Sequence, residues 1–486
     1  MDFPLFHLDF MGNRMLIAVV AIIHVMINHP MAVGMMPLIT LMEYFGYKTG
    51  DQRWDKLAHK ILFVCFIVTT TAGALTGVGI WLSISLVNPY AIGSLIRIFF
   101  WGWFTEWIVF VLEVCLIMAY YLLWEKMRAR PQKLNHIRIG VALSISSWLT
   151  MGVIVAILGF MMDPGDWTTP GKSGLITGML NPLYLPQLAF RTPIAMVGAG
   201  LFAWFLLPFY VKHDIAFRLK AIRFISIWCL CWLPLLFVGA LWYHDRIPTM
   251  MQGNMDVAIA TQQWAGKSQS LLWITWVSAG VVVVTVTAGL LKPKLIPRVA
   301  LLIPFILIIA LLGQFERVRE FIRKPYVIGN YMYANGIRVK DYPLLQKEGI
   351  LKYATYVHVR EVTEENKIIA GEDVFGIACT RCHTTQGVNS VVTKFDNLYG
   401  INTQWDSTAM AAFIKGMHNI RPFMPPFPGN DKELDALVAY IQHLKATGQT
   451  LSGMQSTGVV IAPPMPSNNR IPLSASPAAV TDVIPQ

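Results

Sequence analysis

The chain contains 486 residues, of which 55% are hydrophobic and only 14% are charged. A typical soluble protein carries about 25% charged residues, so this composition argues against a soluble enzyme. The net charge of +11 could favour a nucleic-acid partner, but the basic residues lie in short clusters between apolar stretches, which is typical of membrane topology. We therefore expect a polytopic protein of the lipid bilayer, with no nucleic-acid partner.

Eight apolar stretches are long enough to cross the hydrocarbon layer, which requires about 20 residues. They are residues 15–46, 57–87, 92–124, 137–162, 191–211, 221–243, 270–291 and 296–315. The first stretch is too long for the core of a signal peptide, so we expect it to remain as the first helix.

Lys and Arg are distributed unequally over the connections between these spans. The connections after the odd-numbered spans hold sixteen, whereas the N-terminus and the other connections hold four. The positive-inside rule then places both chain termini outside. We expect a multi-pass protein of a bacterial inner (plasma) membrane, with its N-terminus and C-terminal region in the periplasm.

The pattern changes after residue 316, where the apolar spans end. The sequence predicts an all-α protein with a transmembrane bundle of about eight spans in residues 1–328 and a polar connector in 329–370. A small helical domain follows in residues 371–448. The Pro/Ser-rich tail, residues 449–486, is expected to be disordered.

The sequence Cys379-Thr380-Arg381-Cys382-His383 is the attachment signature of a c-type haem. Two thiols one turn apart can add to the two vinyl groups of one haem, and the adjacent His383 can ligate the iron. A redox dithiol or half of a zinc site also uses Cys-x-x-Cys, but the chain has no second such pair. Haem is attached outside the cytoplasm, which agrees with the charges of the loops. We therefore expect one covalent haem c.

Met424 is the first candidate for the sixth ligand of this iron. It precedes two prolines and a predicted helix over residues 433–445, an order similar to that of class I cytochromes c, in which such a methionine ligates the iron. Met417 and His418 are alternatives. The chain contains 24 methionines, so packing is the simpler role for any one of them.

Ionisable residues inside the spans are functional candidates because a charge in the bilayer core costs about 2.5–3.5 kcal/mol. His24 and His29 lie in the first span, and imidazole commonly ligates iron. Glu106 and Glu113 lie seven residues apart in the third span and therefore on one helix face, which indicates a proton path or a metal site. Hydrogen bonding between helices is the alternative for all four residues.

Charged residues also cluster where the eighth span ends. The cluster comprises Glu316, Arg317, Arg319, Glu320 and Arg323. A solvated helix end at the membrane interface is the simpler interpretation of such a cluster.

Together, these residues resemble subunit I of cytochrome bd-type terminal oxidases over about residues 15–335. The anchors are His24 with Pro30 and Gly34, Leu112-Glu113, Leu180-Asn181-Pro182, and Glu320-Phe321-Ile322-Arg323-Lys324-Pro325-Tyr326. The last corresponds to the family's Glu-x-Gly-Arg-Gln-Pro-Trp signature, with Trp replaced by Tyr.

The resemblance implies roles at the matching positions. His24, with His29 as its rival, would ligate an active-site haem, and Glu320 would ligate the neighbouring high-spin haem b. Arg323 would support the propionates. Glu106 and Glu113 would belong to the proton route and the oxygen site.

Three departures from the family fall on its quinol-oxidising half. The low-spin haem b needs a His at the start of helix five, where this chain has Phe190-Arg191-Thr192-Pro193. It also needs a Met early in helix seven, and Leu271–Ser278 offers none. The segment Met255–Trp264 lacks the Lys and Glu of the quinol loop. The chain resembles a divergent branch of this superfamily that carries a C-terminal cytochrome c domain instead.

We therefore predict a membrane terminal oxidase subunit that accepts electrons through haem c and reduces oxygen to water at a high-spin haem, type b or d. The catalytic residues would be Glu106, Glu113 and Arg323. A soluble periplasmic cytochrome c would be the electron donor and a second membrane subunit would be a partner. The alternatives are an electron-transfer subunit without oxygen chemistry and a reductase of another small oxidant such as nitric oxide.

Overall fold

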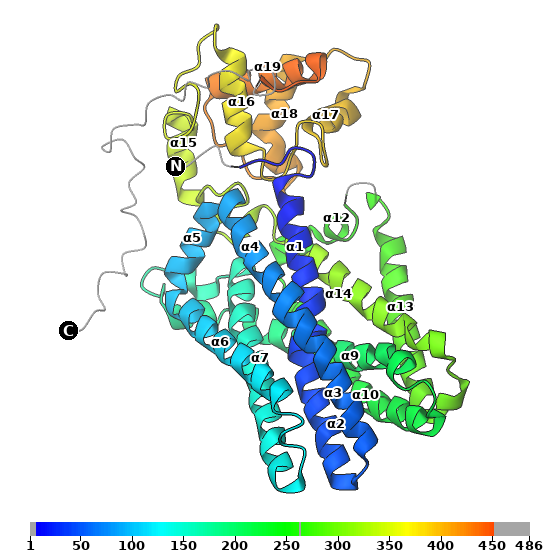
Figure 1. Ribbon diagram of the computed structural model, residues 1–486. Helices are drawn as coiled ribbons and strands as arrows, with labels where there is room; N and C mark the ends of the chain where they lie inside the picture. Colours follow the sequence, from blue (N-terminus) through cyan, green and yellow to red (C-terminus); the bar gives the residue numbers. More distant parts are fainter. Residues whose placement is uncertain (1–5, 262–263, 452–486) are drawn as a thin grey trace, which may run out of the picture.

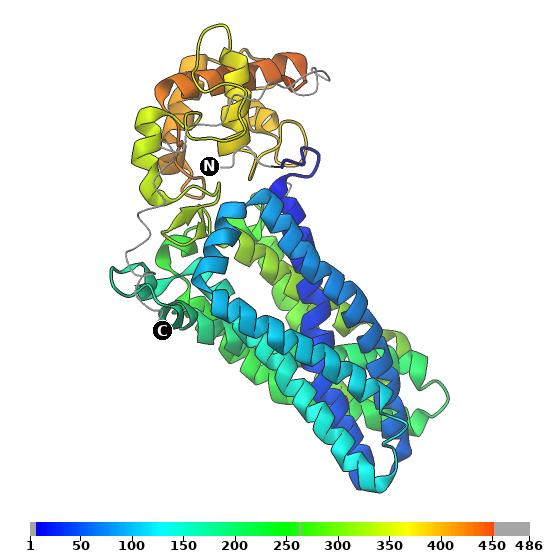
Figure 2. The same cartoon turned by 60° about the vertical axis from the view of Figure 1, so that its left-hand side comes forward.

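The computed structural model describes residues 6–261 and 264–451, which form a long helical bundle with a smaller helical domain at one end (Figures 1 and 2). The predicted tail, residues 449–486, lies almost wholly outside these described residues. Eight helices in the described part are long and apolar enough to cross a membrane. The prediction of an all-α, multi-span bundle followed by a small helical domain is confirmed.

The first two spans are long and each contains a π-helical turn. The first consists of α1 (Asn13–Asn28), the π-helical turn η1 (His29–Gly34) and α2 (Met35–Thr49). The second consists of α3 (Gln52–Val68), the π-helical turn η2 (Thr69–Gly73) and α4 (Ala74–Val87). A π-turn inserts one extra residue into a helix and often marks a functional site.

The other spans are single helices apart from the eighth, which begins with a 3-10 turn. They are α6 (Phe100–Leu122), α7 (Arg130–Met162), α9 (Tyr184–Tyr210), α10 (Ile215–Arg246), α13 (Ser268–Leu291), and the 3-10 turn η6 (Arg298–Leu301) with α14 (Ile303–Ile322). The connections contain α5 (Pro89–Ile98), η3 (Gly165–Thr168), α8 (Leu175–Met179), α11 (Thr249–Gln252), α12 (Met255–Ile259) and η5 (Pro293–Leu295).

Helix α9 forms the centre of the bundle. In its most apolar stretch 78% of the residues are buried, against at most 44% in the other seven spans. Small residues let the neighbouring helices approach it closely. A Cβ atom at Gly34 would collide with the backbone carbonyl of Ala195, so glycine is required where η1 crosses α9. The outer helices keep exposed apolar faces.

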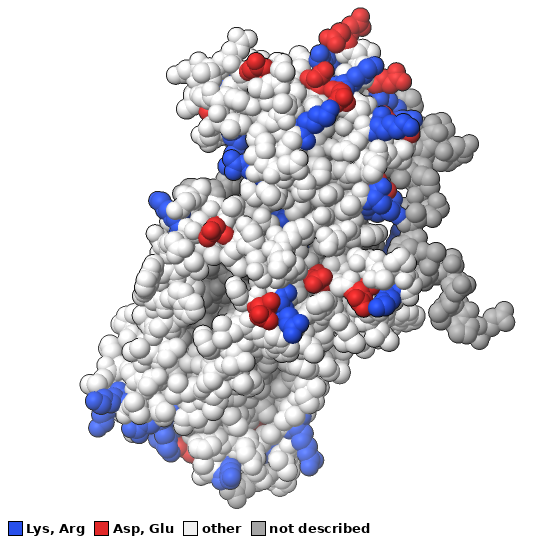
Figure 3. All heavy atoms as spheres, turned by 180° about the vertical axis from the view of Figure 1, so that it is seen from behind, with Lys and Arg blue, Asp and Glu red and all other residues white. Residues whose placement is uncertain are grey.

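The start of the chain and the C-terminal domain lie at the same end of the bundle, as the even number of spans requires. The connections after the odd-numbered spans consequently lie at the opposite end. Figure 3 shows Lys and Arg side chains gathered at that end. The connections rich in Lys and Arg in the sequence thus lie together at one end of the folded bundle, and the connections with few basic residues lie at the other.

A short antiparallel hairpin links the bundle to the C-terminal domain. It consists of β1 (Tyr326–Ile328) and β2 (Met332–Tyr333), and is followed by η7 (Val339–Asp341) and α15 (Tyr342–Glu348). The domain itself contains α16 (Lys367–Ala378), α17 (Val391–Tyr399), α18 (Ser407–Ile420) and α19 (Asp431–Thr447). Helices α16 and α19 pack directly against each other.

The connector joins the hydrophobic core of this domain rather than running free. Leu345, Ile350 and Leu351 are buried in the same cluster as residues of α16 and α19. Glu433, in the capping box at the start of α19, also accepts hydrogen bonds from the backbone N–H groups of Ile350 and Leu351, both at 2.9 Å. The predicted boundaries of connector and domain stay predictions, but the two segments share one core.

Candidate functional site

The Cys-x-x-Cys-His segment forms a tight turn directly after α16. The backbone N–H groups of Cys382 and His383 both donate to the carbonyl of Cys379, at 3.0 and 2.9 Å. This turn places the two cysteines and His383 on one short stretch of backbone. Burial raises the pKa of the Cys379 thiol to about 12, so this thiol is protonated at neutral pH.

His383 is oriented by the loop that follows it. Its Nδ1 lies 3.1 Å from the backbone carbonyl of Asn389, an acceptor, so Nδ1 carries the proton and Nε2 keeps its lone pair. Asn389 has a positive φ of 63°, which asparagine tolerates, and its side chain donates to the carbonyl of Cys382 at 2.6 Å. Burial lowers the pKa of His383 to about 4, so the imidazole is neutral. This donor set fits a covalent haem c.

Met424 lies in the loop between α18 and α19, and His418 holds that loop. The Nδ1 atom of His418 is 2.6 Å from the backbone carbonyl of Met424. Met417 packs against the hydrophobic core of the domain. Met417 thus has a packing role, whereas the contact of His418, like that of His383, leaves its Nε2 lone pair available. Met424 stays the first candidate for the sixth ligand, with His418 as its alternative.

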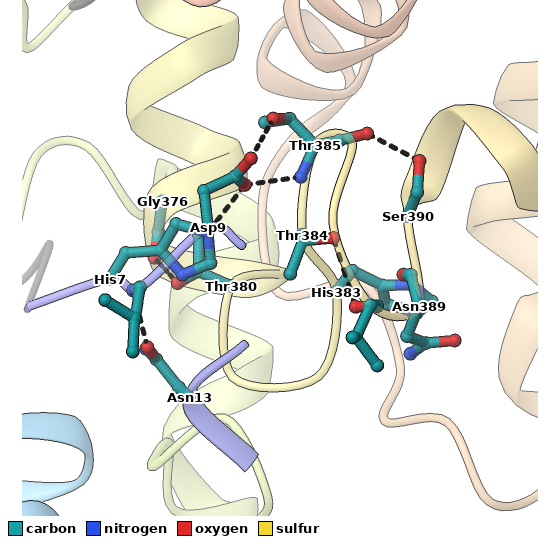
Figure 4. A network of polar contacts seen from close by, with 12 residues as sticks. His7, Asp9, Asn13, Gly376, Thr380, His383, Thr384, Thr385, Asn389 and Ser390 are labelled. Carbon is teal, nitrogen blue, oxygen red and sulfur yellow. Dashed lines mark hydrogen bonds and ion pairs between the residues drawn. The ribbon is translucent and has the colours of Figure 1, made fainter. Parts of the chain in front are cut away.

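The start of the described chain is attached to the loop that follows His383 (Figure 4). The Asp9 carboxylate accepts hydrogen bonds from the backbone N–H and the hydroxyl of Thr385, at 2.6 and 2.7 Å. The carbonyl of Phe10 accepts from the backbone N–H of Val388 at 3.2 Å. Helix α1 begins three residues later, so the loop after His383 is tied to the helix that carries His24 and His29.

A second contact joins this domain to the end of α14. The rings of Phe423 and Phe321 lie 5.7 Å apart, and the guanidinium of Arg14 lies 4.4 Å above the Phe321 ring. Phe423 immediately precedes Met424, and Phe321 immediately follows Glu320. The candidate ligand loops of the domain therefore face the end of the bundle that carries Glu320.

Glu320 and Arg323 form an ion pair at this end of α14, and the ammonium of Lys324 lies 3.5 Å from the same carboxylate. Burial lowers the pKa of both Arg323 and Lys324, although nearby Glu320 acts in the opposite direction. Within the described residues, Nε of Arg323 and Nη1 of Arg319 are buried without a hydrogen-bond partner. Orphaned guanidinium N–H groups fit an acidic ligand group such as a haem propionate.

His29 and His24 have different surroundings. His29 lies in η1, and its Nε2 is 3.0 Å from Nη1 of Arg191, which can only donate. That contact uses the Nε2 lone pair of His29. His24 lies one turn earlier, and its Nδ1 contacts Thr76 and the carbonyl of Gly73, at 3.1 and 3.2 Å.

Arg191 lies in the stretch where, by the resemblance, the family has a His ligand of its low-spin haem b and this chain has none. It is fully buried and pairs with Glu316 at 2.6 Å, and Glu316 also pairs with Arg319 at 2.9 Å. A guanidinium has no lone pair to offer to iron. The cavity beside this network, lined by Phe190, Tyr243 and Arg319 among others, has a volume of about 180 Å³, below the 300–1,000 Å³ typical of a ligand pocket. The residues at this position do not fit a low-spin haem.

This network corrects the interpretation of the charges at the end of the eighth span. Glu316 and Arg319 are 4% and 8% exposed, so they do not form a solvated helix end. Sequence reasoning missed the pairing because Arg191 lies more than a hundred residues earlier. The available signal was an arginine inside an apolar span, since such a charge needs a partner.

Glu113 and Glu106 lie on α6 as their spacing predicts. Glu113 accepts hydrogen bonds from Ser147 and Thr150 of α7, at 2.6 and 3.2 Å. Glu106 is partly buried and makes no hydrogen bond within the described part of the chain. Among the described residues, no hydrogen bond or ion pair joins His24, Glu106 and Glu320, so the structure does not link them directly.

Sequence reasoning also missed a buried polar cluster at the opposite end of the bundle. It comprises Glu43, Asp55, Tyr120, Lys133 and His136, from α2, α3, α6 and α7. Asp55 and Lys133 fall in the connections between the predicted spans, where charged residues are common. Glu43, inside the first apolar stretch, was the signal.

Comparisons with known proteins agree with both halves of this description. Residues 13–241 match the family of cytochrome bd terminal oxidase subunit I, and residues 366–441 match cytochrome c oxidase, cbb3-type, subunit III. The structure of bd oxidase from Geobacillus thermodenitrificans has a similar fold, with a TM-score of 0.55 and 13% sequence identity over 66% of this chain and 89% of that one. No curated relative matches the chain. The resemblance noted in the sequence is confirmed.

Proposed function

We propose that this chain, a bundle related to cytochrome bd oxidase subunit I that carries a cytochrome c domain, is the haem-containing subunit of an oxygen-reducing terminal oxidase. One observation carries the proposal. The loops of His383 and Met424 face the end of α14 that bears Glu320, through the Asp9–Thr385 and Phe321–Phe423 contacts. Electrons that reach haem c would therefore be delivered to the bundle beneath it.

His24 is proposed as the histidine ligand of the membrane haem. The lone pair of His29 Nε2 accepts from Arg191, whereas Nε2 of His24 has, among the described residues, only Asn28 as a hydrogen-bond contact, at 3.4 Å. The π-turn η1 begins at His29 and contains the Pro30–Gly34 anchor.

Glu320, Arg319 and Arg323 would serve the neighbouring high-spin haem. Glu320 is proposed as a ligand of high-spin haem b, and the orphaned N–H groups of Arg319 and Arg323 would bind propionates. When bound, such a haem would supply the iron at which oxygen is reduced. Glu113, held by Ser147 and Thr150, and Glu106, further along the same face, would hold and pass protons.

A soluble cytochrome c is proposed as the donor in place of a quinol. The Arg191–Glu316–Arg319 network fills the position of the low-spin haem that would accept electrons from a quinol site. Helix α6 has only 11% of its apolar stretch buried, which favours contact with lipid or with a second membrane subunit. The basic end of the bundle would face the cytoplasm and the cytochrome c domain the periplasm.

Oxygen consumption by the purified protein tests this proposal. With a reduced soluble cytochrome c as donor, we expect cyanide-sensitive oxygen uptake, and little uptake with a quinol. Carbon monoxide should shift the spectrum of the reduced membrane haem. Absence of both oxygen uptake and a carbon monoxide shift would overturn the proposal in favour of a pure electron-transfer subunit. Uptake of nitric oxide without uptake of oxygen would indicate a different acceptor.

A further inference from the structure

A buried cluster of titratable side chains lies at the end of the bundle opposite the cytochrome c domain. Its centre is the carboxylate of Glu43, which is 0% exposed. Lys133 and His136 both approach Oε1 of Glu43 at 2.6 Å, and the hydroxyl of Tyr120 donates to Oε2 at 2.6 Å. Lys133 also pairs with Asp55 at 2.5 Å. We name these five residues the basal cluster.

The hydrogen bonds of His136 imply a shared proton. Its Nε2 lies 2.8 Å from the backbone carbonyl of Tyr120, which only accepts, so Nε2 carries a hydrogen. Its Nδ1 lies 2.6 Å from the Glu43 carboxyl, and that contact also needs a hydrogen between the two atoms. The pair of His136 and Glu43 therefore holds two hydrogens. One lies on Nε2, and the second lies between Nδ1 and the Glu43 carboxyl and is shared by the two groups.

The basal cluster has a continuous connection to solvent. Glu125 is 63% exposed and lies 3.2 Å from Arg128, whose side chain is 38% exposed. Arg128 lies 3.7 Å from Asp55, and Asp55 contacts Lys133. His59, which is partly exposed, lies 3.6 Å from Glu125. Exposure thus falls stepwise from the surface to Glu43, and this end of the bundle also carries the Lys- and Arg-rich connections.

The basal cluster also lies in line with the two glutamates of α6. Tyr120, Glu113 and Glu106 are spaced by seven residues and share one face of the helix, with a rise of about 10 Å between neighbours. Helix α7 supplies polar partners along the same seam, with His136 beside Tyr120, and Ser147 and Thr150 beside Glu113. On α2, the Thr40 side chain hydrogen-bonds to Tyr120. A static ion pair between helices would need none of this alignment.

We propose that the basal cluster is the proton-uptake site of the protein, which takes protons from solution at the end opposite the cytochrome c domain and passes them to Glu113 and Glu106. The proposal rests on the proposed oxygen reduction, O2 + 4e⁻ + 4H⁺ → 2H2O, whose electrons come from the reduced donor cytochrome. Each proton leaving the Glu43–His136 pair toward Glu113 is replaced by one from solution through the Asp55–Lys133 side. Tyr120 links the pair to the α6 seam.

Glu43→Gln in the purified full-length protein tests this role, because the amide keeps the size of the side chain but cannot carry the proton. Haem content and reduction of haem c by the donor should equal those of the wild type. Steady-state oxygen uptake should fall at least tenfold, and a pH indicator should report slower proton uptake after oxygen is mixed with reduced protein. Unchanged oxygen uptake and an unchanged pH profile would overturn the proposal.

Asp214→Asn is the matched control, because Asp214 is an exposed carboxylate at the same end and asparagine preserves its cap on α10. It should leave uptake unchanged. If Glu43→Gln lost its haem, Tyr120→Phe would decide, since it removes only the hydroxyl; normal turnover in that variant would overturn the proposal. A wild-type protein that takes up no oxygen would instead refute the proposed function, and with it this role.

Discussion

The cytochrome c domain and the transmembrane bundle place their candidate haem ligands in different ways. In the domain, two thiols and a histidine lie within five residues, and a single loop contact from Asn389 orients the imidazole. In the bundle, His24 and Glu320 lie on α1 and α14, nearly three hundred residues apart, and ion pairs around them decide which groups remain free. A local motif reveals its chemistry in the sequence, whereas a dispersed site depends on how helices pack.

The largest effect is expected when the local motif is removed. Replacing Cys379 and Cys382 by Ser abolishes the thioether links, so the pyridine haemochrome should lose its c-type band while the b-type band remains. Oxygen uptake with reduced cytochrome c should fall to background. Cys115→Ser, at an exposed position on α6, is the control and should change neither. Donor-driven turnover in the double variant would show that electrons bypass the domain.

The features that could be predicted from the sequence are the local ones, and those that could not are assembled from distant helices. The eight spans, the grouping of basic residues at one end and the haem c signature depend on composition and short spacing, and they could be predicted. Arg191 and Glu316 could not be paired in advance, since nothing in the sequence indicates that α9 and α14 meet there. The hydrogen bond of His29 and the basal cluster also depend on contacts between helices. The choice between His24 and His29, and the proposed proton-uptake site, could therefore be made only from the folded structure.

The second prediction separates the two histidines of the first span. His24→Ala should lose the carbon monoxide-reactive membrane haem and most oxygen uptake, because the proposed ligand is removed. His29→Ala should keep that haem, since its Nε2 serves Arg191. Optical spectra of reduced protein with and without carbon monoxide measure both. The reverse pattern would assign the ligand to His29 and would contradict the argument from its hydrogen bond.

Arg191→Leu tests the buried ion network that stands in place of a low-spin haem. Removing one partner of a fully buried ion pair costs about 3–5 kcal/mol, because Glu316 loses its 2.6 Å contact while its carboxylate stays buried. Thermal unfolding in detergent should report this loss. Arg246→Leu removes an exposed arginine near the end of α10 and should have almost no effect. Equal stability of the two variants would show that the network is not required for folding.

The smallest expected effect concerns the attachment between the two regions. Asp9→Ala removes both hydrogen bonds from Thr385, and because the Asp9 side chain is 40% exposed, the cost after screening is on the order of 1 kcal/mol. Electron transfer from haem c to the membrane haem, followed by stopped-flow spectroscopy, should slow while the spectrum of haem c stays the same. Asp166→Ala, which breaks an exposed pair with Lys172, is the control and should leave the rate unchanged.

The pH dependence of that attachment has a definite sign. Burial by itself would raise the pKa of Asp9, but hydrogen bonds from Thr385 outweigh it, so the pKa lies below the ordinary value of 3.8. The carboxylate therefore contributes fully above that value, and its contribution is lost as the pH falls through the lower pKa of the folded protein. Wild-type electron transfer should slow in that acidic range, whereas the Asp9→Ala protein should show no such step. An equal fall in the electron-transfer rate with pH in both proteins would show that another group titrates. It would also show that Asp9 does not hold the domain in place.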